Sequence, residues 1–339
     1  MTMVSADNST ERSLIDQHGR TIRYLRISVT DRCDLRCRYC MAEQMTFLPR
    51  AKLLSLDEIA IIAERFIARG VTRIRLSGGE PLVRRDVADL VRRLGSHVGH
   101  GLDELTMTTN GTRLAEHADA LVDAGIRRIN VSLDSRDPER FRYITRHGDV
   151  RQVIHGILSA RDAGLMIKIN MVALKGLNED EIASMLSWCI SERLDLSLIE
   201  TMPLGAIDED RVDRFLPLTT VFDWLSTEFS LLRVGHRTGG PARYWQVEGS
   251  TTRLGLISPL TANFCDGCNR VRLTTEGKLY MCLGHEDQVD LKAALRDGGI
   301  VGLDAAIDRG LAAKPARHDF RIEAGAAPAV GRHMSVTGG

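Results

Sequence analysis

Six of the seven cysteines fall into two groups of three. The groups are Cys33-x3-Cys37-x2-Cys40 and Cys265-x2-Cys268-x13-Cys282. Thiolates at such short spacings hold iron–sulfur clusters or zinc. A structural zinc ion takes four protein ligands, whereas a cubane cluster held by three cysteines keeps one iron open for a small molecule. We therefore favour a cluster at the first group. At the second group, where Cys-x2-Cys also resembles half a zinc ribbon, cluster and zinc are about equally supported.

The elements around the first group alternate between short β-like runs and amphipathic helical stretches. The β-like runs cover 22–29, 72–77, 104–109, 127–133, 165–173 and 194–200, and the clearest helical patterns cover 59–67, 150–158 and 182–190. Gly70, Gly125 and Gly164 stand at helix-to-strand joints, where a helix often takes a left-handed cap. Repeated β–helix–β units imply right-handed crossovers and a parallel sheet. This order is typical of an α/β fold, as a doubly wound sheet or an incomplete barrel.

One face of five successive predicted strands is polar, which a sheet covered on both faces would not tolerate. Its charged members include Arg26, Arg75 and Lys168. The other members are Tyr24, Ser28, Arg73, Ser77, Thr106, Thr108, Asn110, Asn130, Ser132, Asp134 and Asn170. Such residues could satisfy one another, but over five strands we favour a wet interior that holds a polar ligand. The sequence therefore predicts an incomplete (β/α)6 parallel barrel.

The repeat ends near residue 205. Shorter β-like pieces follow at 242–249, 253–258, 270–274 and 278–283, and then helical segments at 289–313. We expect an N-terminal polar segment over 1–21, the partial barrel over 22–232, and a smaller C-terminal α+β domain over 233–339. This last unit contains the second cysteine group.

Composition excludes several classes of protein. The 339 residues contain 45 Lys and Arg against 45 Asp and Glu, which argues against a nucleic-acid or anionic-membrane binder. No apolar run approaches the roughly 18 residues of a membrane helix, and the first twenty residues lack a signal-peptide core. We expect a cytoplasmic protein with reduced cysteines, because an odd number fits no tidy disulfide framework.

Tyr39 stands before the last cysteine of the first group, and Gly78-Gly79-Glu80 follows the next predicted strand. These features resemble the radical S-adenosylmethionine superfamily. Further motifs are YLRISVTDRCDLRCRYCM, RIRLSGGEPLVRRD, TTNGTRL, RRINVSLDS, the second cysteine group with Arg270 and Arg272, and the terminal Gly338-Gly339. Together they resemble the GTP 3′,8-cyclase family within that superfamily, from about residue 18 to the C-terminus.

The resemblance implies a lyase that performs the first step of molybdenum cofactor biosynthesis. A 5′-deoxyadenosyl radical would take the C3′ hydrogen from the ribose of GTP, and the C3′ radical would attack guanine C8. The product would be (8S)-3′,8-cyclo-7,8-dihydroguanosine 5′-triphosphate. The radical would arise at a cluster and S-adenosylmethionine, so no side chain is implied as catalytic.

The same resemblance implies two [4Fe-4S] clusters and assigns roles to residues. Cys33, Cys37 and Cys40 would hold the first cluster, and Tyr39, Gly79, Ser132 and Met202 would contact S-adenosylmethionine. Cys265, Cys268 and Cys282 would hold an auxiliary cluster whose open iron binds guanine. Arg26, Arg75, Thr108, Lys168, Arg270 and Arg272 would bind GTP, since basic side chains match phosphate oxygens.

The expected partners are GTP, a low-potential electron donor and the next enzyme of the pathway, cyclic pyranopterin monophosphate synthase. We expect a monomer or homodimer that binds neither nucleic acid nor membrane. Two alternatives compete with this hypothesis. One is another auxiliary-cluster radical enzyme that acts on a peptide or small molecule, and the other is a zinc-binding structural protein.

Ser197 departs from the family pattern. Many relatives have an arginine here, in a strand that reads like LRFIE, whereas this chain has LDLSLIE. One phosphate contact is therefore in doubt, and we hypothesise that Arg243 or Lys278 compensates.

Overall fold

The computed structural model describes residues 13–207, 211–323 and 327–338. Residues 1–12 of the predicted N-terminal segment and Gly339 lie outside the described residues. Within those ranges, no helix has the length and apolar character needed to cross a bilayer.

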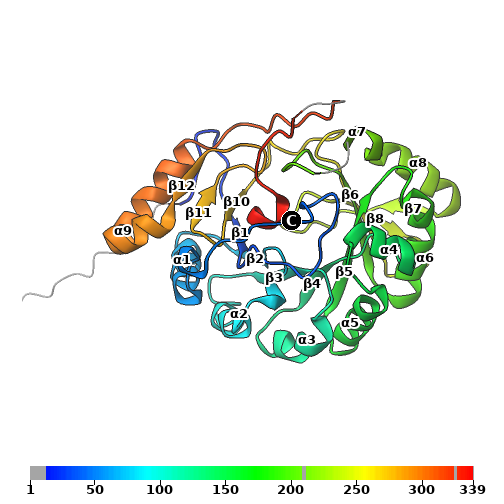
Figure 1. Cartoon of the computed structure of the whole chain (residues 1–339), viewed down its shortest axis with the longest axis horizontal. Helices are drawn as coiled ribbons and strands as arrows, with labels where there is room; N and C mark the ends of the chain where they lie inside the picture. Colours follow the sequence, from blue (N-terminus) through cyan, green and yellow to red (C-terminus); the bar gives the residue numbers. More distant parts are fainter. Residues whose placement is uncertain (1–12, 208–210, 324–326, 339) are drawn as a thin grey trace, which may run out of the picture.

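Six parallel strands follow one another around the barrel in chain order (Figure 1). They are β1 Tyr24–Ser28, β2 Arg73–Ser77, β3 Glu104–Thr109, β4 Arg128–Ser132, β5 Met166–Ala173 and β6 Asp195–Glu200. Each lies within the β-like run predicted for it. The prediction of an incomplete parallel barrel is confirmed.

Helices cover the outside of these strands (Figure 1). They are α1 Leu56–Ala68, α2 Val87–Gly95, α3 Leu114–Asp123, α4 Pro138–Thr145, α5 Val150–Asp162, α6 Ile182–Glu192, α7 Arg211–Arg214 and α8 Leu218–Glu228. Helix α1 begins with a capping box between Ser55 and Glu58. The glycines predicted to cap helices, Gly70, Gly125 and Gly164, all have φ between 89° and 98°.

The C-terminal part of the chain extends the same sheet at both ends. Strand β10 (Arg270–Leu273) adds parallel to β1, and β9 (Arg253–Ile257) adds parallel to β6. Antiparallel strands continue outward from them: β11 Lys278–Tyr280 and β12 Gln288–Asp290 beyond β10, and β8 Arg243–Val247 and β7 Leu231–Arg233 beyond β9. The two halves therefore share one sheet, and the domain division at 232/233 stays a prediction.

Two further helices complete the described chain. Helix α9 (Leu291–Ala312) bends at Gly299, which has non-helical backbone angles, and it packs beside β11 and β12. The short α10 (Met334–Thr337) lies in the middle of the barrel, near β1 (Figure 1).

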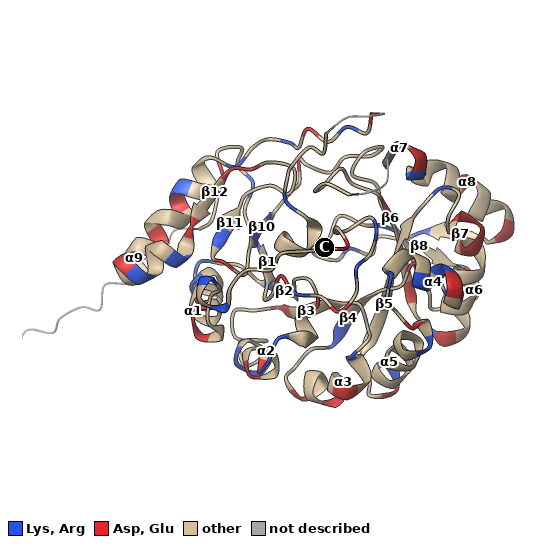
Figure 2. Cartoon of the chain, viewed as in Figure 1, with Lys and Arg blue, Asp and Glu red and all other residues tan. Residues whose placement is uncertain are grey.

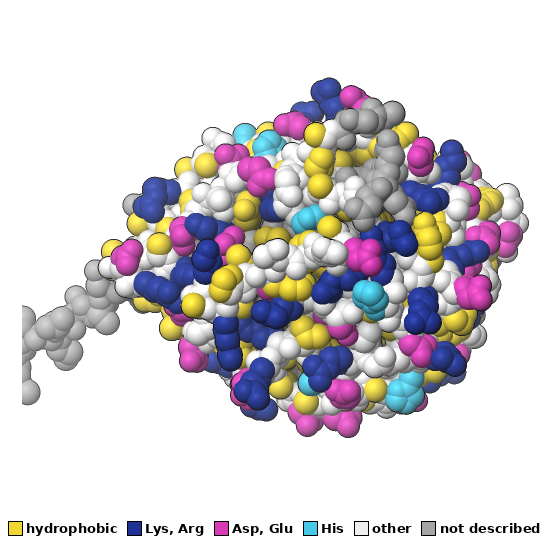
Figure 3. Space-filling view, viewed as in Figure 1, with side chains coloured by type: hydrophobic (Ala, Val, Ile, Leu, Met, Phe, Trp, Pro, Cys, Tyr) yellow, Lys and Arg dark blue, Asp and Glu magenta, His cyan; other side chains and the backbone are white. Residues whose placement is uncertain are grey.

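The two faces of the sheet differ as the sequence predicts. The apolar side chains of the strands, such as Ile27, Ile74 and Val131, are fully buried in the core shared with the helices. Acidic residues lie mainly on the outer helices, whereas lysines and arginines also occur on the barrel strands (Figure 2). Figure 3 shows acidic and basic side chains interspersed over the face in view, as expected from their equal numbers.

Candidate active site

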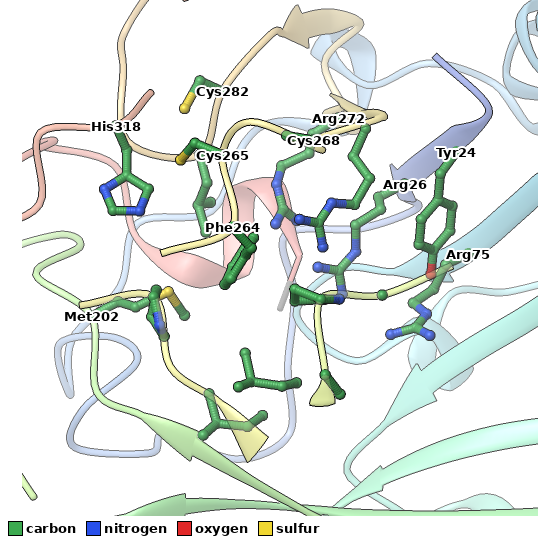
Figure 4. Close-up of a pocket in the computed structure, with 18 of the residues that line it drawn as sticks. Tyr24, Arg26, Arg75, Met202, Phe264, Cys265, Cys268, Arg272, Cys282 and His318 are labelled. Carbon is green, nitrogen blue, oxygen red and sulfur yellow. The ribbon is translucent and has the colours of Figure 1, made fainter. Parts of the chain in front are cut away.

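A cavity inside the barrel collects nine of the predicted site residues (Figure 4). They are Arg26, Arg75, Lys168, Met202, Cys265, Cys268, Arg270, Arg272 and Cys282. Strands β1, β2, β5 and β10 supply the cations, and the second cysteine group lies at one end. The polar strand faces thus converge on one interior space, as predicted.

The cavity concentrates positive charge away from water. Arg26, Arg75, Lys168 and Arg272 are all buried. Burial lowers the pKa of Arg272 to about 10, with Arg270 adding repulsion, and lowers the pKa of Lys168 well below its ordinary value, with Arg75 adding repulsion. Among the described residues, no carboxylate lies within ion-pair distance of Arg75, Lys168 or Arg272, and Asp195 and Glu104 attract Lys168 only from farther away. Because unpaired buried charges are costly, this interior suits an anionic ligand.

The second cysteine triad, Cys265, Cys268 and Cys282, adjoins these cations. Burial raises the pKa of Cys265 and Cys282. Burial also opposes ionisation of Cys268, but Arg270 and Lys314 outweigh it and lower the pKa of that thiol to about 7. Arg270 also lies over the Phe264 ring, 5.1 Å from its centroid. A thiol that ionises near neutral pH is ready to bind a metal, and the donor set fits a group that takes three thiolates.

The first triad, Cys33, Cys37 and Cys40, lies in the loop after β1. The Cys40 N–H donates to the Cys37 carbonyl at 2.9 Å, and the Arg38 N–H donates to the Ile144 carbonyl at 2.9 Å. Burial raises the pKa of Cys33 and of Cys40 to about 12. In Cys37, burial and then Cys40 raise the pKa well above its ordinary value. Three neighbouring, half-buried thiols with raised pKa values therefore ionise only with a cationic partner, which an iron–sulfur cluster would supply.

In the described part of the chain, no three Cys, His, Asp or Glu side chains are grouped so as to hold one metal ion.

The Gly78-Gly79-Glu80 turn fastens the first loop to the barrel. The Gly79 N–H donates to the Thr30 carbonyl, and the Glu80 N–H to the Arg32 carbonyl, both at 2.8 Å. A Cβ at Gly79 would lie 2.3 Å from the Arg32 carbonyl oxygen, so no side chain fits.

Glu80 itself is completely buried. Its carboxylate accepts from the N–H groups of Leu82 (3.0 Å) and Asn110 (2.6 Å) and from the Thr109 hydroxyl (2.8 Å). Burial nevertheless raises the pKa of Glu80 to about 7. Glu80 therefore fixes the turn.

Seven predicted site residues do not line the central cavity. They are Cys33, Cys37, Cys40, Tyr39, Gly79, Thr108 and Ser132. The Tyr39 hydroxyl donates to Asp134 at 2.7 Å, and Asp134 also accepts from the Val172 N–H at 2.8 Å. The Thr108 hydroxyl oxygen is buried and has no hydrogen-bond partner within 13–207, 211–323 and 327–338. The roles predicted for all sixteen residues stay predictions.

The C-terminal helix α10 links the two triads. The Gly338 carbonyl accepts from the Arg272 guanidinium at 3.0 Å, and the Ser335 backbone hydrogen-bonds the Cys40 thiol. A Cβ at Gly338 would lie 2.0 Å from the Ser77 hydroxyl oxygen, so position 338 requires glycine. Gly338 therefore contacts Arg272, one of the residues that line the cavity.

Sequence reasoning missed several residues that the structure brings to the cavity. Tyr244 lies next to the cavity lining, and its hydroxyl accepts from the Lys168 ammonium at 3.1 Å. Phe264 and His318 line the cavity, and within the described residues the buried His318 Nε2 has no hydrogen-bond partner. Alternation along β8 could have pointed to Tyr244, but nothing local marks His318.

The structure places neither of the two basic residues expected to compensate for Ser197 in the lining of the cavity, and the compensation itself stays a hypothesis. Ser197 is buried, and within the described residues its hydroxyl has no hydrogen-bond partner. Lys278 is ion-paired with Asp290 at 2.7 Å on β11 and does not reach the cavity. Arg243 is exposed and lines a neighbouring surface cleft. On the sheet, Gly255 of β9 lies between Ser197 of β6 and Tyr244 of β8, and both of their side chains lie beside it.

Comparison with known proteins places these features in a family. Residues 27–189 match the model of the radical SAM superfamily, and residues 194–320 match that of Molybdenum Cofactor Synthesis C. The GTP 3′,8-cyclase of Erythrobacter litoralis (strain HTCC2594) is 57% identical over 327 residues, covering 96% of this chain and 98% of its own. That of Rhizobium etli (strain CIAT 652) is 56% identical over 330 residues, covering 96% and 94%.

A solved structure supports the fold. Streptococcus suis SuiB bound to S-adenosylmethionine aligns with a TM-score of 0.63 at 15% identity, covering 88% of this chain and 69% of SuiB. The two family models and the near-full-length relatives agree on one family. The chain therefore belongs to the GTP 3′,8-cyclase family of radical SAM enzymes.

Proposed function

We propose that this chain converts GTP to 3′,8-cyclo-7,8-dihydroguanosine 5′-triphosphate, the first step of molybdenum cofactor biosynthesis. The observation that carries the proposal is the interior group of buried cations at the second triad, Arg26, Arg75, Lys168 and Arg272. A triphosphate carries several negative charges and would neutralise these side chains. The names of the near-full-length relatives support the same substrate.

Membership of the superfamily implies a [4Fe-4S] cluster and S-adenosylmethionine. Cys33, Cys37 and Cys40 would hold that cluster, with Tyr39, Gly79, Ser132 and Met202 around the cofactor. The group would supply a carbon radical that takes the C3′ hydrogen of the ribose. Once C3′ has bonded to guanine C8, one electron from the low-potential donor and one proton would complete the product.

The residues of the chain position the substrate for that chemistry. Arg26, Arg75 and Lys168 would hold the phosphates from three barrel strands, with Thr108, Arg270 and Arg272 as further contacts. Fixed contacts of this kind hold the reacting atoms in place and make the step effectively intramolecular. The buried walls of the cavity would keep water and other hydrogen donors from the radical.

We also propose an auxiliary [4Fe-4S] cluster at Cys265, Cys268 and Cys282, whose open iron takes the guanine base. Three thiols in a cationic surrounding, facing the proposed phosphate site, support this assignment. The reaction needs a low-potential electron donor, and the product would pass to cyclic pyranopterin monophosphate synthase. The barrel with its C-terminal unit would act as a monomer or homodimer in the cytoplasm.

The test is an anaerobic assay of the full chain, reconstituted with iron and sulfide. Deoxyadenosine is measured after adding S-adenosylmethionine and dithionite, with and without GTP. We expect GTP to increase deoxyadenosine strongly and a cyclised GTP product to be detected by mass. Equal deoxyadenosine with and without GTP, and no cyclised product, would reject GTP as the substrate.

A further inference from the structure

One lysine is buried directly behind the second cysteine triad. Lys314 follows α9 and is 1% exposed. Its ammonium donates to the carbonyls of Arg270, at 2.9 Å, and Met281, and lies 3.8 Å from the Cys268 sulfur. The two carbonyls belong to the segments that carry Cys268 and Cys282. All three ammonium donors are thereby directed at the surroundings of this triad.

In the part of the chain that the structure describes, no carboxylate contacts the Lys314 ammonium: its polar contacts are two neutral carbonyls and one sulfur. The carboxylate of Asp16 acts on it only from a distance and is ion-paired with Arg20. A buried ammonium needs a nearby negative charge to offset its desolvation. The thiolates of a cluster at this triad, with the Cys268 sulfur 3.8 Å from the ammonium, would supply that charge. The buried position of Lys314 is therefore electrostatically favourable when the cysteines of the triad are ionised, as they are around a cluster.

The N-terminal segment holds the backbone of this lysine in place. Gln17 donates to the Lys314 carbonyl at 3.1 Å, and Arg20 donates to the Pro315 carbonyl at 2.6 Å. Arg20 also donates to the Cys265 carbonyl at 3.0 Å and is ion-paired with Asp16 at 2.6 Å. One arginine therefore ties the lysine segment to a ligand of the triad, which fixes Lys314 relative to the sulfurs.

We propose that Lys314 is a positioning residue that raises the reduction potential of the auxiliary cluster. This inference rests on the auxiliary cluster of the proposed function. Reduction adds one electron from the low-potential donor to the oxidised cluster, and no bond forms or breaks. A fixed positive charge and an N–H···S contact stabilise the more negative, reduced cluster.

The experiment uses the full chain with Cys33, Cys37 and Cys40 replaced by alanine, so that only the second triad can bind iron. After reconstitution, iron and sulfide are counted and the midpoint potential is measured by electron paramagnetic resonance during a redox titration. We compare this parent with Lys314→Met and Lys314→Gln. The matched control is Lys292→Met, which removes a lysine that donates to the Lys52 carbonyl, away from both triads.

We expect Lys314→Met to shift the midpoint potential to more negative values. Lys314→Gln should shift it in the same direction by less, because it keeps a donor without the charge, and Lys292→Met should leave it unchanged. If Lys314→Met binds its full complement of iron and its midpoint potential is unchanged, the inference on Lys314 is overturned. The auxiliary cluster of the proposed function is not contradicted by that result. A parent that binds no cluster overturns the auxiliary cluster and this inference together.

A second measurement does not depend on the variants folding. The parent is labelled with nitrogen-15 at the lysine side chains, and the reduced cluster is examined by pulsed electron paramagnetic resonance. We expect a hyperfine coupling to a lysine nitrogen, from the ammonium close to the Cys268 sulfur. The absence of such a coupling overturns the inference.

Discussion

The two cysteine triads offer the same three ligands in opposite electrostatic surroundings. The first lies beside Asp34, Asp134 and Glu80, which raise the thiol pKa values further after burial has done so. The second lies beside Arg270 and Lys314, which bring the pKa of Cys268 to about 7 against the effect of burial. Acidic neighbours oppose extra negative charge and cationic neighbours favour it. The acidic surroundings of the first triad thus favour a strongly reducing cluster. The cationic surroundings of the second triad favour a cluster that receives an anionic substrate.

The largest test of this contrast replaces one cysteine in each triad. We expect Cys33→Ala to abolish deoxyadenosine formation, because the first cluster loses a ligand. We expect Cys268→Ala to keep some deoxyadenosine formation while losing the cyclised product. Anaerobic assays that quantify both products check this. Loss of deoxyadenosine in both variants would show that the triads do not have separate tasks.

Thiol reactivity in the cluster-free protein tests the difference between the surroundings of the two triads without an assay of substrate conversion. At pH 7 a thiol of pKa about 7 is about half ionised, whereas one of pKa about 12 is ionised to about one part in 10⁵. Cys268 should therefore react with iodoacetamide well before Cys33, at a rate that rises through pH 7 and levels off above it. Mass spectrometry of the labelled peptides measures both rates, and the buried Cys189 serves as a slow control. Equal rates at Cys268 and Cys33 would contradict the assigned surroundings.

Lys168→Met tests the cationic surroundings near the second triad, at the proposed phosphate site. Removing this charge should weaken GTP binding by about tenfold or more, since a hydrogen bond to a charged group contributes roughly 1.5–3 kcal/mol. The same change should raise the Tm of the GTP-free protein by a few degrees, as it removes a buried charge repelled by Arg75. Calorimetric binding and thermal unfolding measure the two effects. A lower Tm with unchanged affinity would show that Lys168 is structural.

Glu80→Gln tests the acidic surroundings of the first triad through the pH dependence of folding stability, without any effect on substrate binding. The pKa of Glu80 is raised from 4.5 to about 7 in the folded state, so the folded protein binds the proton more tightly than the unfolded chain. The free energy of unfolding should therefore fall by up to about 3 kcal/mol as pH rises from about 4.5 to 7, and the variant should lose that decline.

Denaturant titrations of the cluster-free protein at several pH values measure this slope. Asp134, whose pKa burial raises to about 6, should contribute a smaller decline that persists in the variant. Identical slopes in the parent and Glu80→Gln would mean that Glu80 is already ionised in the folded state at low pH.

Local patterns were sufficient to predict the barrel and its polar interior. Arg26, Arg75 and Lys168 face the cavity because side chains alternate along strands whose positions the helix-to-strand glycines mark. Lys314 could not be predicted in the same way. Its contacts to Cys268 and Met281 are made across the fold, and nothing in its own segment records them. The same holds for β9 and β10, whose parallel partners are distant in the chain.

The placement of β9 and β10 has a consequence for synthesis of the chain. Until residues 253–273 emerge from the ribosome, the edges of β1 and β6 lack the strands that finally pair with them. Unpaired parallel edges with apolar faces readily join other chains. The nascent barrel therefore passes through a stage at which aggregation competes with folding, and a chain cut near residue 232 would remain at that stage.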